Sequence, residues 1–101
     1  MSAYRAELER RWLHLTREAL PAAAGERGWP VHLDHCFQRI LLDNAFDGCW
    51  YDHVAGRPAY RHCPPEALTR AVALGEAALA GEADLSAMNA RSLRWRGRSA
   101  R

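Results

Sequence analysis

Apolar residues recur at helical spacing in the first part of the chain. Within residues 3–20 the large apolar side chains lie three or four positions apart, so they share one face of an amphipathic helix. Ser2 is a suitable N-cap residue. Pro21 and the loop-forming sequence GERGWP after it predict that the helix ends at residue 20, and Trp29 is expected to fold back onto the core. The apolar face comprises Tyr4, Leu8, Trp12, Leu15 and Ala19.

A second helix is predicted over residues 33–45. Asp34 lies near its positive end, where a carboxylate is favoured, and Gly48 is expected to be its left-handed cap. The next sequence, CWYDHV, predicts one or two helical turns, and AGRPAYRHCPP at 55–65 predicts a loop. The apolar stripe of the second helix comprises Leu33, Cys36, Phe37, Ile40, Leu41 and Asn44.

Two more helices complete the pattern. One begins at the sequence PPEAL and stops at Gly81, because proline suits the first turn of a helix and glycine its end. The last covers residues 85–96 and has Asp84 as its N-cap. Their apolar faces comprise Leu68, Val72, Leu74, Gly75 and Leu79, and then Leu85, Met88, Ser92 and Trp95.

These elements predict an all-α fold, because no alternating strand pattern and no hairpin signal appear. We expect one compact bundle of about four longer helices and one short helix over residues 1–97, with a disordered tail at 98–101. The sequence contains no apolar run of about 18 residues that predicts a membrane span. Because the N-terminus also lacks a secretory signal, the protein is expected to be cytoplasmic. Three cysteines, an odd number, predict free thiols.

The charge of the chain is uneven. All 14 basic residues are arginine, which excludes lysine-based covalent chemistry. Five of these arginines and no acidic residue fall in residues 91–101, so this end carries +5 and the rest carries 9 − 12 = −3. The segment Arg91 to Arg101 interleaves Trp95 with cations, which is one way to bind nucleic acid through phosphates and a stacked base. The alternative is a solvated helix end whose cations complement the helix dipole.

The stretch DNAFDGCWYDHVAGRPAYRH, residues 43–62, carries most of the candidate chemistry. Arg39 and Asp43 are four positions apart and predict an ion pair that holds the WYDH segment or forms the polar floor of a pocket. Arginine forks recognise carboxylates and phosphates, and tryptophan and tyrosine provide flat walls. The alternative is a loop that fills the bundle. The candidate ligand-binding residues are Arg39, Asp43, Trp50, Tyr51, Asp52, His53, Arg57, Tyr60 and Arg61.

Histidine and cysteine spacing suggests two other kinds of site. His32 and Cys36, and then Cys49 and His53, are four apart, so each pair could present two ligands to a tetrahedral zinc ion. The same Cys36 could act as a nucleophile, with His53 or His62 as its base and Asp52 to orient that base. The alternative is that Cys36 packs as a small hydrophobic residue.

The sequences LDHCFQRILLDNAFDGCWYDH, GRPAYRH and LRWRG resemble a family of bacterial proteins of roughly one hundred residues that is often labelled GNAT-type N-acetyltransferase. The resemblance covers about residues 30–97 and implies acyltransferase activity with acetyl-CoA. The chain contains no Arg/Gln-x-x-Gly-x-Gly/Ala loop of the kind that holds the cofactor's pyrophosphate in GNAT domains. The residues that carry the resemblance are Asp34, His35, Cys36, Phe37, Arg39, Asp43, Trp50, Tyr51, Asp52, Arg57, Pro58, Tyr60 and Arg61.

The sequence as a whole favours a small accessory or binding protein that holds an anionic or planar ligand, or a segment of a partner protein. No cofactor is predicted for this function, and no oligomeric state follows from the sequence. Three other functions remain as alternatives. They are an acyltransferase, a nucleic-acid-binding accessory protein, and a small structural zinc protein.

Overall fold

The computed structural model describes residues 2–97 and confirms the all-α fold, with four longer helices, one short α-helix and no strand in that range. The predicted tail at 98–101 lies outside the described residues. The Cα radius of gyration is 12.9 Å, close to the 13 Å or so expected of a folded chain of about 100 residues. No helix between residues 2 and 97 combines the length and apolar character needed to cross a membrane.

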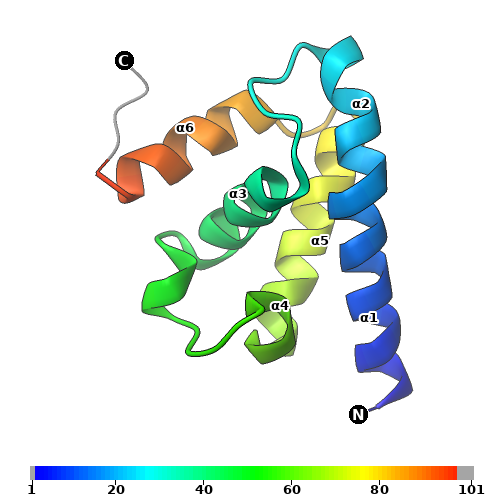
Figure 1. Ribbon diagram of the computed structural model, residues 1–101, viewed down its shortest axis with the longest axis vertical. Coiled ribbons are helices and arrows are strands. Elements are labelled where there is room, and N and C mark those ends of the chain that lie inside the picture. Colours follow the sequence, from blue (N-terminus) through cyan, green and yellow to red (C-terminus); the bar gives the residue numbers. More distant parts are fainter. Residues whose placement is uncertain (1, 98–101) are drawn as a thin grey trace.

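The first helix is longer than predicted. It runs as one rod through α1 (Ala3–His14), the π-helical turn η1 (Leu15–Ala19) and α2 (Leu20–Arg27), and Ser2 caps its start as predicted (Figure 1). The prediction that it ends at Pro21 is wrong. A proline ring clashes with the carbonyl group four residues earlier in a regular α-helix. Here the wider turn precedes the proline, with the Leu20 N–H bonded to the Leu15 carbonyl, and relieves that clash.

The second predicted helix is confirmed as α3 (Asp34–Phe46), which lies at the centre of the molecule (Figure 1). Its left-handed cap is Asp47, with a φ of 54°, so the prediction of Gly48 as that cap is wrong. Aspartate tolerates the left-handed conformation better than most residues. The N–H groups of Asp47 and Gly48 both bond to the Asp43 carbonyl and close the helix.

The segment between α3 and the next long helix contains two short elements. The 3₁₀ turn η2 (Trp50–Asp52) lies in the sequence for which one or two helical turns are predicted. The predicted loop at 55–65 also contains a four-residue helix, α4 (Ala59–His62). Pro58 is the N-cap residue of α4, and its ring fixes its own φ at −69° where the helix begins.

The last two predicted helices are confirmed as α5 (Pro65–Leu79) and α6 (Leu85–Trp95). The Asp84 carboxylate caps α6 by accepting the Ala87 N–H at 3.0 Å. Both helices pack against α3, and α5 also packs against the first helix. In Figure 1, α3 therefore separates α6 from α1 and α5.

The core lies where α1, η1, α3 and α5 meet. Trp29 packs edge-on against Phe37, with ring centroids 5.9 Å apart, so it folds back onto the core as predicted. Leu33 and Tyr4 were expected on apolar faces but are 47% and 61% exposed. Leu33 is the extended N-cap residue of α3, so its side chain does not follow the helical face. The largest fully buried side chains include Trp12, Phe37, Leu8, Leu20, Ile40, Leu41, Leu68, Leu85 and Met88.

Candidate ligand pocket

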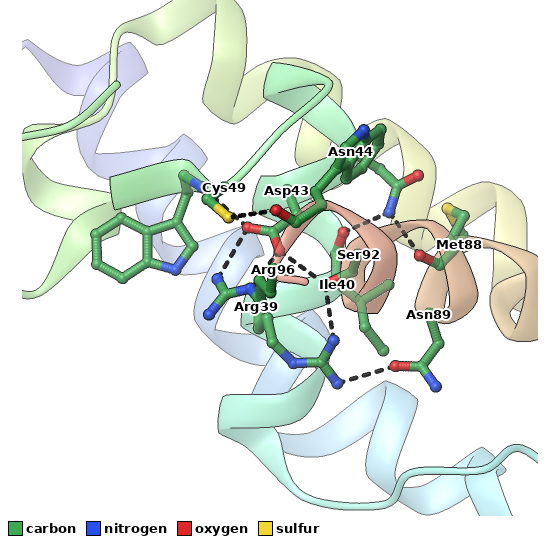
Figure 2. A network of polar contacts seen from close by, with 11 residues as sticks. Arg39, Ile40, Asp43, Asn44, Cys49, Met88, Asn89, Ser92 and Arg96 are labelled. Atoms are coloured by element: carbon green, nitrogen blue, oxygen red, sulfur yellow. Dashed lines mark hydrogen bonds and ion pairs between the residues drawn. The ribbon is translucent and has the colours of Figure 1, made fainter. Parts of the chain in front are cut away.

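Asp43 is a fully buried carboxylate that holds three parts of the chain together. Its Oδ1 atom accepts the Trp50 N–H at 2.9 Å and an Nη2–H of Arg96 at 3.0 Å. Its Oδ2 atom accepts the Arg96 Nε–H and the Ser92 hydroxyl, both at 2.7 Å (Figure 2). Asp43 therefore holds the WYDH segment through the Trp50 N–H, which is one of the two roles that the sequence suggests for an Arg39–Asp43 pair, but the prediction that Arg39 is its ion-pair partner is wrong. The partner is Arg96, which α6 brings back across α3.

Arg39 is fixed by α6 through neutral groups. Its Nη1 atom donates to the Ser92 hydroxyl oxygen at 2.7 Å, and its Nη2 atom donates to the Asn89 Oδ1 atom at 2.9 Å (Figure 2). Within residues 2–97 Arg39 forms no salt bridge with a carboxylate. Ser92 accepts from Arg39 while it donates to Asp43, so its one hydroxyl group links the two charged side chains.

The charges in this cluster do not cancel. The cluster contains two guanidinium groups, Arg39 and Arg96, and one carboxylate, Asp43, which leaves one positive charge in excess. Burial lowers the pKa of Arg39 and the neighbouring charge of Arg96 lowers it further, while Cys36 and the Asp43 carboxylate partly offset this by raising it. The hydrogen bond to Asp43 instead raises the pKa of Arg96. Of the two guanidinium groups, Arg39 is therefore the one that is not bonded to the carboxylate.

Arg39 is one of the residues that line a pocket of about 240 Å³ between α3 and the segment that carries η2 and α4. Trp50 forms one wall, and the Arg57 guanidinium lies 5.3 Å from the centroid of the Trp50 ring. Polar groups and apolar surface both reach the pocket, and no carboxylate is among its lining residues within the described part of the chain. The pocket is lined by His35, Gln38, Arg39, Leu42, Trp50, Arg57, Pro58 and Ala59.

The predicted ligand-binding residues do not all meet at this pocket. Three of them line it, namely Arg39, Trp50 and Arg57. Asp43 does not line it and is connected to Arg39 through the hydroxyl group of Ser92. Tyr51 is half exposed, and the Arg96 guanidinium lies 5.0 Å from its ring centroid.

The remaining predicted residues lie elsewhere on the molecule. Asp52 and His53 are exposed, and the His53 ring stacks on Phe46 with centroids 4.9 Å apart. Tyr60 is buried, and its carbonyl accepts from Arg5 at 2.7 Å, so it joins α4 to α1. Arg61 is exposed beside the Tyr60 ring.

Five lining residues are not among the predicted ligand-binding residues, although His35 and Pro58 are among those that carry the family resemblance, and three of the five had a detectable signal. His35, Gln38 and Leu42 share one face of α3 with Arg39, so helical spacing alone could have grouped them. Pro58 and Ala59 had no such signal, because the course of the chain after Trp50 decides their position.

The cysteines do not gather around a common point. Cys49 is buried and donates to the Trp95 carbonyl at 3.4 Å, whereas Cys36 is half-buried on α3. His32 lies before α3, outside the helix that carries Cys36. Across residues 2–97, no three or more His, Cys, Asp or Glu side chains are placed to hold one metal ion. The geometry therefore adds no support to the zinc prediction.

The basic C-terminal segment is partly committed to the fold. Arg96 is bound to Asp43, and the Arg91 Nε–H donates to the Asn44 side chain at 3.0 Å. Arg98 and Arg101 lie outside the described residues. Of the predicted phosphate-binding arginines, Arg96 is thus already neutralised by a buried partner.

Comparison of the chain with protein-family models, with curated proteins and with solved structures found no match. The resemblance to the GNAT-labelled family therefore stays a prediction, and the pocket has to be interpreted from its own chemistry.

Proposed function

We propose that the protein binds a small organic anion, with an acidic group at Arg39 and a planar or apolar body against Trp50. The observation that carries this proposal is that half-buried Arg39 lines the pocket while its guanidinium forms no salt bridge with a carboxylate among the described residues. A buried charge without a counter-charge costs free energy, and an anion in the pocket offsets that cost.

The size of the pocket limits the ligand. Pockets for drug-sized molecules typically measure about 300–1,000 Å³, whereas this one measures about 240 Å³. A single ring or short chain that bears one carboxylate, phosphate or sulfonate suits this space. A complete nucleotide cofactor does not fit inside it.

Each lining group has a distinct role in this proposal. Arg39 is held in place and provides a charge of fixed direction, while the exposed Arg57 closes over the anion from the other side. The Gln38 amide already donates one N–H to the Thr16 hydroxyl at 3.0 Å, and its second N–H is a neutral donor for either a carboxylate or a phosphate. Trp50 and Leu42 provide the apolar contact that favours an organic acid over an inorganic ion.

The test is calorimetric titration with benzoate, phenyl phosphate and the neutral isostere benzamide. We expect the two anions to bind the wild-type protein and benzamide to bind at least tenfold more weakly, because charge-assisted hydrogen bonds contribute about 1.5–3 kcal/mol. Arg57→Gln should weaken the binding of both anions. Arg61→Gln is the matched control, since Arg61 is also exposed and lies four residues away but outside the pocket.

Two results would contradict the proposal. One is equal affinity for benzoate and benzamide, which would show that charge is not recognised. The other is an equal effect of Arg57→Gln and Arg61→Gln, which would place the anion on the general surface. Native mass spectrometry of the purified protein adds an independent measurement, because a retained organic acid would appear as extra mass.

A further inference from the structure

The polar face of α6 contributes no residue to the lining of the pocket, yet it forms hydrogen bonds with the guanidinium group of Arg39, which is a lining residue. Asn89 and Ser92 are three positions apart on α6 and each accept one hydrogen bond from the Arg39 guanidinium. Figure 2 shows both side chains directed at Arg39 from the same helix. Residues three apart share one helical face, so the spacing places two acceptors side by side.

We infer that Asn89 and Ser92 are positioning residues for anion recognition, and that the neutral charge of Asn89 determines the specificity of the pocket. This inference rests on the proposed function of the same pocket. Its central observation is chemical. Arg39 is held by an amide oxygen and a hydroxyl oxygen, although a carboxylate at either position would bind a guanidinium more strongly.

The choice of neutral acceptors has a direct consequence for binding. A guanidinium group has five N–H donors, and these two bonds use two of them. Neutral acceptors orient the group without placing a counter-charge in direct contact with it. A carboxylate acceptor would orient the group equally well but would neutralise it, and an incoming anion would then no longer be attracted to it.

Ser92 has a second role that separates it from Asn89. Its hydroxyl hydrogen is donated to Asp43 at 2.7 Å, so its oxygen lone pairs are free to face Arg39. The buried Asp43 therefore fixes the direction of the Ser92 hydroxyl, while its own charge is taken up by Arg96. Within residues 2–97 Asn89 forms no hydrogen bond with Asp43, so a substitution of Asn89 affects Arg39 without disturbing the Asp43 carboxylate directly.

The test compares Asn89→Asp with Asn89→Ala by thermal unfolding and by calorimetric titration with benzoate and benzamide. Asn89→Asp keeps the shape of the side chain and adds a carboxylate beside Arg39. We expect its melting temperature to be equal to or above that of the wild type and its affinity for benzoate to fall at least tenfold. Asn89→Ala should weaken benzoate binding about three- to tenfold, because Arg39 is less well oriented. Neither variant should change the weak binding of benzamide.

Arg91→Gln is the matched control, because it also removes a polar contact between α6 and α3, the bond to Asn44, without touching Arg39. It should keep the wild-type ratio of benzoate to benzamide affinity. The inference is overturned if Asn89→Asp is as stable as the wild type and still binds benzoate with wild-type affinity, in which case the anion pocket itself stands. If the wild-type protein does not prefer benzoate to benzamide, the proposed function fails and the inference fails with it.

Discussion

Asp43 is the residue whose environment differs most from that of an ordinary surface carboxylate. It is fully buried, and its two oxygens accept four hydrogen bonds, three of them from Arg96 and Ser92 on α6 or just beyond it. Removal of one partner of a buried ion pair leaves the other charge unpaired, which costs far more than the loss of an exposed pair. The stability of the molecule should therefore depend strongly on this one side chain.

We expect Asp43→Asn to lower the free energy of unfolding by about 3–5 kcal/mol, as measured by urea denaturation. The Arg96 guanidinium would lose its counter-charge while its side chain remains only 14% exposed. Glu7→Gln is the control, because Glu7 pairs with Arg10 where both side chains are more than half exposed, and it should change stability by less than about 1 kcal/mol. Equal effects of the two substitutions would show that the Asp43 pair is not buried in solution.

Cys63 gives a prediction that depends on pH. Burial raises the pKa of its thiol to about 11, whereas an unfolded cysteine ionises near 8.5 or so. The unfolded state therefore releases a proton first, and stability is fully present below the unfolded value and is lost as pH rises toward the folded one. Between pH 8 and pH 11 the stability advantage of wild type over Cys63→Ala should shrink by on the order of 2–3 kcal/mol. A difference that stays constant over this range would contradict the shifted pKa.

At the scale of the element, two glycines show how packing reverses an intrinsic preference. Gly25 in α2 has open space around the position of an added Cβ atom, but at Gly75 in α5 that atom would lie 2.5 Å from a Leu15 methyl carbon and 3.0 Å from one of Leu41. Alanine is favoured over glycine in a helix by about 1 kcal/mol. Overpacking of a close-packed core costs about 1–3 kcal/mol.

We therefore expect Gly25→Ala to stabilise the protein by about 0.5–1 kcal/mol and Gly75→Ala to destabilise it by about 1–2 kcal/mol, with both measured by thermal unfolding. Each substitution is the control for the other, because both replace a glycine in a helix with alanine and so add one methyl group. A gain at both positions would mean that Leu15 and Leu41 move aside without loss, and that α5 packs less closely against η1 and α3 than the structure indicates.

The helices could be predicted because their signals are local. The apolar residues of α3, α5 and α6 repeat every three or four positions within each helix. The caps at Ser2 and Asp84 lie directly before the helices that they begin. The course of the chain through Pro21 could not be predicted in this way. Proline normally ends a helix, and only the π-helical turn η1 shows how this helix continues.

In the candidate site, too, local features could be predicted from the sequence and contacts between distant residues could not. Arg39 and Asp43 are four positions apart in the sequence, which predicts that they pair, but the partner of Asp43 is Arg96, which is 53 positions away. The acceptors of Arg39 on α6 are 50 and 53 residues away. Local spacing carries no information on how α6 crosses α3. The presence of a polar cluster near Asp43 was therefore predictable, but the hydrogen-bond partners within that cluster were not.

At the scale of the whole molecule, α3 connects two groups of helices. On one side it packs against η1 and α5, where most of the large buried side chains lie, and on the other it packs against α6 (Figure 1). The contact with α6 includes the polar cluster of Asp43, Ser92 and Arg39. Opening of α6 alone would break these bonds and leave the larger core in place. We therefore expect α6 to exchange its amide hydrogens faster than α3 and α5.

A ligand of the pocket should slow this opening of α6, because Arg39 is oriented by Asn89 and Ser92 only while α6 is docked. If undocking abolishes binding, benzoate at 100 times its dissociation constant would stabilise the docked state by about 2.7 kcal/mol and slow exchange in α6 about 100-fold. Hydrogen exchange with mass spectrometry measures this for peptides that cover residues 85–95. Benzamide at the same concentration should have little effect, and Asn89→Asp should remove the effect of benzoate. Protection confined to α3, with α6 unchanged, would mean that the pocket binds its ligand without any contribution from the last helix.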